Sequence, residues 1–276
     1  MKNALYCLIA SSALFAWPSF GQSTFRSAVD PLAAPMSMTS TSGVLEGYSI
    51  DVLKAVEKEL GSKIEVMPMQ FSGVFPALQA GNIDFIGPQV TATVARAETM
   101  LFSEGIIEVD AVFLVPASGP AFNTQDSLKG KVIAVNKGTL WDSWARKEAQ
   151  NVGWTVESYG STNDAMAAVI SGRADATVTS GPQALWTARQ NKQFKVAYQH
   201  KMGDVMAFAF RKDSTALRDK VDEAIECIKA RGELAAIFKT WFGDMVPSAG
   251  VTQPVPGYGV VGLKGYDARV HTPRCK

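Results

Sequence analysis

The chain has 276 residues, of which 47% are hydrophobic and 19% charged, so it can bury a full core and is not expected to be disordered. Its 27 Lys and Arg residues almost balance its 26 Asp and Glu residues, which gives no electrostatic basis for binding nucleic acid or an anionic membrane surface. This length fits one or two domains.

The first 21 residues have the features of a cleavable signal peptide. Lys2 supplies a positive start, residues 4–17 form an apolar run, and Ser19 and Gly21 place small residues before a cleavage site. The apolar run is shorter than the roughly 20 residues that a membrane-spanning helix needs. We therefore expect cleavage near Gly21, secretion and a soluble mature protein.

The first third of the remaining chain alternates between short apolar runs and amphipathic segments. The predicted strands are residues 24–29, 64–67 and 83–86, and the predicted helices are residues 47–60 and 73–80, ended by Gly61 and Gly81. A loop with Pro31 and Pro35 is expected after the first strand. This alternation predicts parallel strands joined by crossover helices.

The segment 84–103, DFIGPQVTATVARAETMLFS, predicts an anion-binding site. A strand of the buried type is followed by Gln89, Thr91 and then Arg96 at an expected helix start. Hydroxyl and amide groups donate single hydrogen bonds, whereas a guanidinium can grip a carboxylate with two. We interpret this segment as half of a ligand site whose other half lies about fifty to ninety residues downstream.

The alternation restarts after an extended run at residues 107–115 and is followed by a second extended run at 205–210. Two α/β units separated by two extended crossings predict a two-lobed protein. Between the runs, the predicted strands are 131–135, 154–159, 176–179 and 194–198, and the predicted helices are 140–150, 164–171 and 183–190. Two amphipathic helices follow, the first with Val221 and Ile225 on its core face and the second over residues 234–242.

The tail from residue 246 is rich in proline and glycine, and this composition predicts a loop. Its GYGVVG run matches a dinucleotide-binding pattern, but it lacks the flanking strand and helix, so we interpret the match as chance. Cys227 and Cys275 are the two cysteines beyond the expected cleavage site, and in an oxidising compartment an even pair predicts one disulfide. Two unpaired thiols are the alternative.

Six segments together resemble the periplasmic solute-binding proteins of polar amino-acid ABC transporters, which are bacterial extracellular solute-binding proteins of family 3. The six are GVLEGYSIDVLKAVEKELG (43–61), FSGVFPALQAGNIDFI (71–86), TATVARAETMLFS (91–103), SLKGKVIAVNKGT (127–139), SGRADATV (171–178) and GELAAIFKTWFG (232–243). The resemblance implies an α/β, two-lobed periplasmic-binding-protein fold of type II, with a mostly parallel sheet flanked by helices in each lobe and two hinge strands between them.

The implied organisation is a signal peptide (1–21), a discontinuous lobe 1 (22–112 plus 207–246), lobe 2 (113–206) and a Pro/Gly-rich tail (247–276). The resemblance also implies capture of a small carboxylate ligand by hinge closure, and its transfer to an inner-membrane ABC permease. A monomer is expected, with no cofactor, no metal and no catalytic residue.

The family's binding residues map onto positions in both lobes. In similar proteins the arginine matching Arg96 binds the ligand carboxylate, together with the residues that match Thr91 and Gln89. Phe71 lies where an aromatic ring often contacts the ligand in these proteins, although it could instead belong to the core. Further ligand contacts are expected from the backbone of Thr139 and Leu140, and from Asn136 and Asp30 at flanking positions. Asn136 could instead only shape its turn. Trp141 is expected to pack within its helix.

Two positions depart from the family pattern. Ser180 stands where similar proteins place the aspartate that holds the α-ammonium group, and Ala33 replaces a ring. Loss of that charge-assisted bond would cost about 1.5–3 kcal/mol of binding free energy. The sequence therefore predicts an acid as ligand, and leaves an amino acid, an N-substituted amino acid and a plain organic acid as alternatives.

Two other functions are weighed. An enzyme similar to cyclohexadienyl dehydratases would need an acidic group in the loop from Ser180 to Gln183, where there is none, and neither His200 nor His271 has triad-like or metal-ligand spacing. A periplasmic sensor or accessory protein for an organic acid remains a second interpretation, because the tail is unusual.

Overall fold

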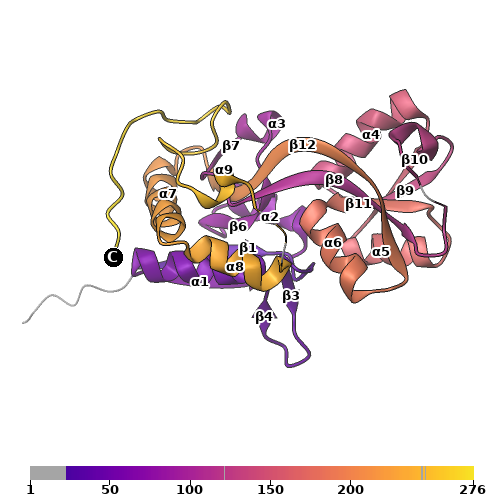
Figure 1. Cartoon of the computed structure of the whole chain (residues 1–276). Helices are drawn as coiled ribbons and strands as arrows, with labels where there is room; N and C mark the ends of the chain where they lie inside the picture. The colour runs from indigo at the N-terminus through magenta and orange to yellow at the C-terminus, as the bar shows by residue number, and fades with distance from the viewer. Residues whose placement is uncertain (1–22, 121, 244, 246) are drawn as a thin grey trace, which may run out of the picture.

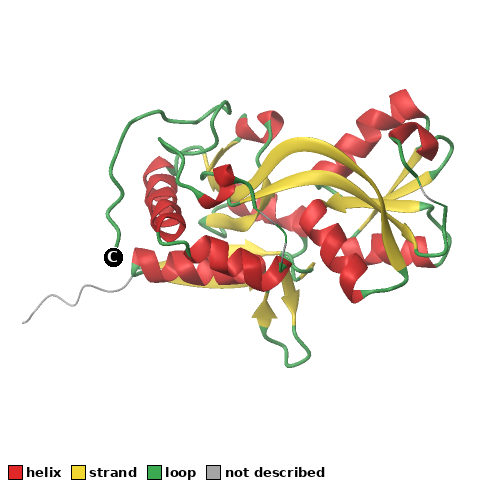
Figure 2. Ribbon diagram, in the orientation of Figure 1, coloured by secondary structure: helices red, strands yellow, loops and turns green. Residues whose placement is uncertain are grey.

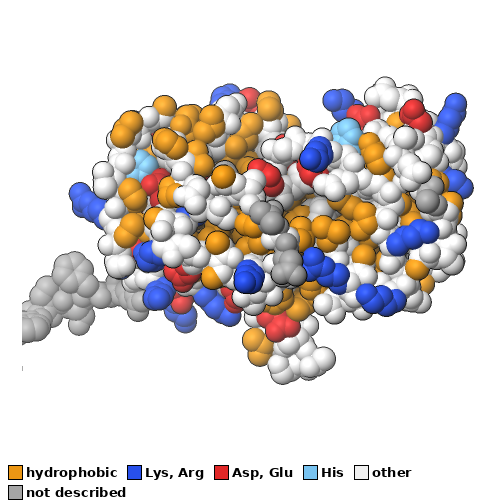
Figure 3. Space-filling model, viewed as in Figure 1, with side chains coloured by type: hydrophobic (Ala, Val, Ile, Leu, Met, Phe, Trp, Pro, Cys, Tyr) orange, Lys and Arg blue, Asp and Glu red, His pale blue; other side chains and the backbone are white. Residues whose placement is uncertain are grey.

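A computed structural model describes residues 23–276 apart from residues 121, 244 and 246. The predicted signal peptide lies outside the described residues. Within them, no helix combines the length and the apolar character needed to cross a membrane. Lys and Arg side chains are interspersed with Asp and Glu side chains on the face seen in Figure 3, in keeping with the balanced composition.

The structure is an α/β protein with two lobes joined by two long strands, β8 (Ile107–Pro116) and β12 (Phe194–Arg211), as Figure 1 shows. One nine-stranded sheet runs through both lobes in the order β10-β9-β11-β8-β12-β6-β1-β5, with β7 also paired to β12. The remaining strands of this sheet are β1 (Thr24–Val29), β5 (Lys63–Pro68), β6 (Phe85–Thr91), β7 (Met100–Phe102), β9 (Val132–Asn136), β10 (Thr155–Tyr159) and β11 (Ala176–Ser180).

The strands that alternate with helices pair in parallel, as predicted, because each crossover helix returns the chain to the same end of the sheet. The pairs made by β8 and β12 are antiparallel. Helices flank the strands in both lobes (Figure 2). They are α1 (Tyr48–Leu60), α2 (Phe71–Gln79), α3 (Val94–Ala97), η1 (Gln125–Leu128), α4 (Leu140–Val152), α5 (Thr162–Ile170), α6 (Gly181–Gln190), α7 (Thr215–Ala230), α8 (Glu233–Phe242) and α9 (Ala249–Thr252).

The amphipathic patterns place their apolar faces in the core. On α1, Leu53 and Val56 are buried, and Gly61 ends the helix in the left-handed region at φ 64°, which glycine adopts without a Cβ clash. On α7, Val221 and Ile225 are fully buried against α1 and α8. These contacts attach α7 and α8 to lobe 1, beside α1.

Three predictions at the level of elements were wrong, and one of them is the loop expected from residue 246, which contains the short helix α9 (Ala249–Thr252). The runs at 194–198 and 205–210 belong to one strand of 18 residues, β12, which pairs with β8 on both sides of a register shift between His200 and Asp204. Residues 32–46 form a small sheet of β2 (Leu32–Ala33), β3 (Ser37–Thr39) and β4 (Leu45–Glu46) in place of a loop. These strands and β7 contain only two or three residues each, which is too few for the alternation of apolar and polar residues to be recognised in the sequence.

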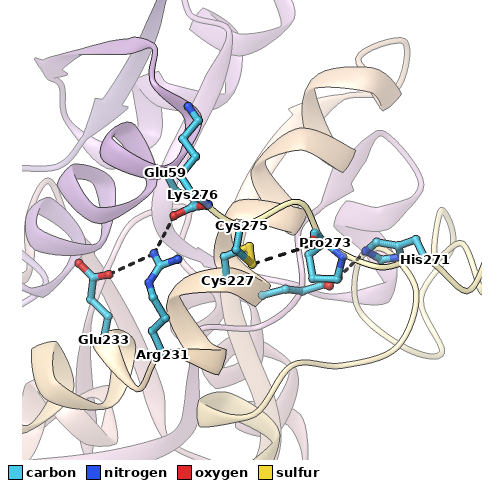
Figure 4. Close-up of a disulfide and its surroundings, with 9 residues drawn as sticks. Glu59, Cys227, Arg231, Glu233, His271, Pro273, Cys275 and Lys276 are labelled. Atoms are coloured by element: carbon cyan, nitrogen blue, oxygen red, sulfur yellow. Dashed lines mark hydrogen bonds and ion pairs between the residues drawn. A yellow bond between two sulfur atoms is a disulfide. The ribbon is translucent and has the colours of Figure 1, made fainter.

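The predicted disulfide between Cys227 and Cys275 is confirmed, with 5.4 Å between the two Cα atoms. Figure 4 shows that it holds the end of the tail beside α7. Next to it, the Glu59 carboxylate accepts hydrogen bonds from the Lys276 backbone N–H and from the Arg231 guanidinium, both at 2.7 Å. The end of the tail is therefore attached to both α7 and α1.

Buried charges also connect the tail to lobe 1. The Lys229 ammonium donates to the Glu104 carboxylate at 2.7 Å, and both side chains are almost completely buried. The same Glu104 carboxylate accepts the Val255 backbone N–H, and Asp222 accepts the Gly259 backbone N–H. The GYGVVG run lies in this docked segment, follows the short helix α9 and contributes Tyr258 to an isolated bridge with Asp267, so it does not have the preceding strand that a dinucleotide-binding motif needs.

Candidate functional site

A small cavity of about 40 Å³ lies between the lobes, where polar residues follow the carboxyl ends of strands. The lining residues come from both lobes, and the strands hold the backbone on each side in a fixed position. They are Asp30, Ala33, Met36, Phe71, Gln89, Thr91 and Arg96 on one side, Asn136, Thr139, Leu140, Trp141, Thr162, Thr177, Val178, Thr179 and Gln183 on the other, and Met206 of β12.

Arg96 reaches across this cavity. Its position is set by Thr93, whose hydroxyl accepts the Arg96 backbone N–H at 3.2 Å and caps α3. The guanidinium donates through Nη1 to the Thr91 carbonyl at 2.8 Å and through Nη2 to the Gly138 carbonyl at 3.1 Å. The second bond joins lobe 1 to the turn before α4.

No carboxylate of the described residues forms an ion pair with Arg96. Its guanidinium lies over the rings of Phe71 and Phe75, 5.8 and 5.1 Å from the ring centroids. Burial lowers the pKa of Arg96 to about 10. A charged group kept in such surroundings favours an anion as partner, because an opposite charge would offset its lost hydration.

Asp30 is the one carboxylate among the residues that line the cavity. It is buried, and its oxygens accept the backbone N–H groups of Leu32 at 2.9 Å and of Phe71 at 3.1 Å. Burial raises the pKa of the Asp30 carboxyl, although these two hydrogen bonds act in the opposite direction. Asp30 thus holds the first turn of α2 in place, and Phe71 both lines the cavity and packs in the core of lobe 1.

Two buried carboxamides face the cavity with one end unpaired. Gln89 contacts the Ser37 hydroxyl at 3.0 Å through Oε1, while its Nε2 has no partner in the described part of the chain. Asn136 donates through Nδ2 to the Thr162 hydroxyl at 3.4 Å, and its Oδ1 likewise has no partner there. Unpaired buried polar atoms cost free energy, so their presence in one cavity is consistent with a polar ligand.

The start of α4 forms another part of the wall. The Thr139 hydroxyl accepts the Asp142 backbone N–H at 3.2 Å and donates to the Asn136 carbonyl at 2.7 Å, which fixes the turn. Leu140 follows it in the wall. Trp141 is buried in the core as expected, yet it also borders the cavity.

Gln183 is one of four polar lobe-2 residues in the wall that the sequence did not single out, together with Thr162, Thr177 and Thr179. The predicted site residues line the cavity with the exception of Ser180, which is fully buried behind Gln183 and caps α6. Gln183 Oε1 accepts hydrogen bonds from the hydroxyls of Thr179 and Ser180, and Nε2 donates to the Ala33 carbonyl at 3.3 Å. The position of Gln183 just after the end of a predicted strand was the available signal.

Two hydrogen bonds therefore join the lobes across the cavity, from Arg96 to Gly138 and from Gln183 to Ala33. Together with the small volume, they describe a closed cleft. A ligand that binds the Arg96 guanidinium can replace the Gly138 carbonyl as the acceptor of its Nη2 group.

Comparison with known proteins supports the interpretation of the fold. Residues 25–244 match the sequence model of the bacterial extracellular solute-binding proteins, family 3. The arginine-binding periplasmic protein of Mannheimia haemolytica is 26% identical over 220 residues, which are 78% of this chain and 90% of that protein. The L-cystine-binding protein TcyA of Bacillus subtilis (strain 168) is 28% identical over 204 residues, or 73% and 74% of the two chains.

Two solved structures are similar at comparable levels. An ancestral arginine-binding protein bound to arginine superposes with a TM-score of 0.76 at 31% identity, covering 80% of this chain and 99% of that one. An ancestral amino acid-binding protein described as a precursor of cyclohexadienyl dehydratase has a TM-score of 0.73 at 29% identity, covering 79% and 95%. The family match ends at residue 244, so it does not include the docked tail.

Proposed function

Because this chain is a member of family 3 of the bacterial extracellular solute-binding proteins, we propose that it is the substrate-binding component of an ABC importer. It captures a small carboxylate ligand, either an amino acid or an amino-acid derivative, between its two lobes. Relatives that bind arginine and cystine support this ligand class. The protein acts in the periplasm as a monomer and delivers the ligand to an inner-membrane permease.

The observation that carries this proposal is the half-buried Arg96 guanidinium, which crosses the cavity without a carboxylate partner in the described residues. Its two Nη groups donate to backbone carbonyls, which are neutral acceptors. A ligand carboxylate supplies the missing charge and can accept two parallel hydrogen bonds. Thr91 and Phe71 contact this group from lobe 1, and Gln89 lines the same cavity.

Capture proceeds in two steps. The carboxylate first binds Arg96 in lobe 1, and the contacts from Asn136, Thr139 and Gln183 are added when lobe 2 closes. β8 and β12 are the connections that bend, since they are the strands shared by both lobes. The ligand shifts the population toward the closed form only by its difference in affinity for the two forms, and about 5.5 kcal/mol would move a ratio of 1:99 to 99:1.

The protein is proposed to bind its ligand without changing it. The loop that would carry a general acid holds Ser180 and Gln183, and the cavity's one carboxylate, Asp30, already accepts two backbone N–H groups. None of these groups is placed as a free acid or base with a neighbouring nucleophile.

The test begins with mass spectrometry of the small molecules released when the purified protein is denatured. Binding of the compound found, or of each of the twenty standard L-amino acids in turn, is then measured by calorimetry on the wild-type protein and on Arg96→Ala. The variant should lose binding by at least a hundredfold, because a charge-assisted pair of bonds is removed. Arg173→Ala, on an exposed arginine of lobe 2, is the control. Unchanged affinity of Arg96→Ala would disprove the site.

A further inference from the structure

The orientation of the Gln183 carboxamide determines what lobe 2 presents to a ligand. One end of the amide faces the Ala33 carbonyl oxygen at 3.3 Å, and because a carbonyl only accepts, that end must be the nitrogen. The other end lies 3.0 Å from the hydroxyls of both Thr179 and Ser180. The Ser180 oxygen already accepts the Gln183 backbone N–H, so its proton points to Oε1.

The oxygen of Gln183 is therefore used within lobe 2, and the nitrogen is the end available at the cavity. An amide nitrogen carries two N–H groups. One of them is directed to Ala33, and the other remains for the ligand. Gln183 is almost completely buried, so an unpaired donor there would not be hydrated.

We propose that Gln183 is a specificity-determining residue that selects, beside the carboxylate, a ligand group that accepts a hydrogen bond. This rests on the proposed binding of a carboxylate by Arg96. The acceptor can be the carbonyl of an N-acyl group or a 2-oxo group. A free α-ammonium is disfavoured at this point, because it would place its own donors against the Gln183 N–H groups.

Asp30 does not remove this selectivity, because it follows β1 in lobe 1, where its carboxylate accepts the backbone N–H groups of Leu32 and Phe71. An ammonium held by Asp30 would leave the Gln183 donor without a partner. An acceptor group leaves no donor unpaired in this part of the wall. The expected discrimination is about tenfold to hundredfold in affinity, the range typical of one buried hydrogen-bonding group.

The experiment uses matched ligand sets with the same side chain: an L-amino acid, its N-acetyl derivative and its 2-oxo acid, for arginine, glutamate and leucine. Affinities are measured by calorimetry on the full-length mature protein. In at least one set, the wild-type protein should bind the N-acetyl or the 2-oxo member at least tenfold more tightly than the free amino acid. The two acceptor-bearing members then show which source of the carbonyl is preferred.

Gln183→Glu replaces the donor by a carboxylate of the same shape and should reverse the preference toward the free amino acid. Gln183→Met removes both polar ends and should reduce the preference to less than threefold, so a second variant is available if the first fails to fold. Gln190→Glu makes the same charge change at an exposed position of α6 and should leave the wild-type preference unchanged.

Failure of this inference can be distinguished from failure of the proposed function. If the free amino acid binds best to the wild-type protein while Arg96→Ala abolishes its binding, the carboxylate site stands and the role of Gln183 is refuted. If the Gln183 variants keep the wild-type preference, the role is also refuted. Binding that survives Arg96→Ala, or no binding by any member of the three sets, overturns both.

Discussion

Replacing Lys229 by methionine should destabilise the protein strongly. The Lys229 and Glu104 side chains are 0% and 1% exposed, and Nζ lies 2.7 Å from the Glu104 carboxylate and 2.8 Å from the Gly105 carbonyl. Methionine retains most of the aliphatic volume but leaves the Glu104 charge buried without its cation. Breaking a buried ion pair in this way costs about 3–5 kcal/mol.

The cost should depend on pH in a defined direction. Burial raises the pKa of Glu104 even in the wild-type protein, where Lys229 opposes the shift. Without Lys229 the pKa of Glu104 rises further, so the folded variant is favoured when this carboxyl is protonated. The stability that the variant gains from protonated Glu104 is then fully present below the pKa of about 4.3 that a glutamate has in the unfolded chain, and it is lost as the pH rises through the pKa of Glu104 in the folded variant.

The assay is urea unfolding of both proteins between about pH 4.5 and pH 8, with the disulfide intact. In thermal unfolding at neutral pH, the midpoint temperature of the variant should also fall by about 6–20 °C, because each kcal/mol lost lowers it by roughly 2–4 °C at this chain length. Lys220→Met changes an exposed lysine on the same helix and should cost less than about 0.5 kcal/mol. A loss below about 1 kcal/mol for Lys229→Met, or one that does not vary with pH, would refute the reasoning.

Two further predictions concern the same end of the molecule. Cys275→Ser removes a disulfide between residues 48 positions apart in the chain, so the free energy of unfolding should fall by about 4 kcal/mol. The urea midpoint of the variant should be lower than that of the oxidised wild-type protein and should match that of the reduced wild-type protein. An unchanged midpoint would contradict this prediction. Burial raises the pKa of Glu226 from 4.5 to about 7, so its contribution to stability should be complete below about pH 4.5 and decrease as the pH rises toward 7. Glu226→Gln should flatten this part of the stability profile, and a profile identical to that of the wild type would exclude Glu226 as the cause.

Local sequence determined most of the elements and one half of the site. Each α/β unit could be predicted because apolar periodicity, glycine helix ends and strand-type runs depend on neighbours in sequence. Arg96 could be singled out for the same reason, since Thr91, Thr93 and Arg96 lie within six residues of one another on β6 and α3. The two cysteines beyond the predicted cleavage site likewise limited the pairing to one choice.

Tertiary structure decided what could not be seen in any single segment. β12 is continuous because it pairs with β8, whereas the polar residues in its middle indicated a break between two strands. Ser180 and Gln183 are three residues apart, and only the fold shows that the serine supports the glutamine from behind. The orientation of the Gln183 amide is set by Ala33, 150 residues away in the chain, because a hydrogen bond requires both groups to be brought within reach. The sequence therefore predicted an acid as the ligand, and the closed lobes supplied the contacts from which we propose which group beside the carboxylate the wall accepts.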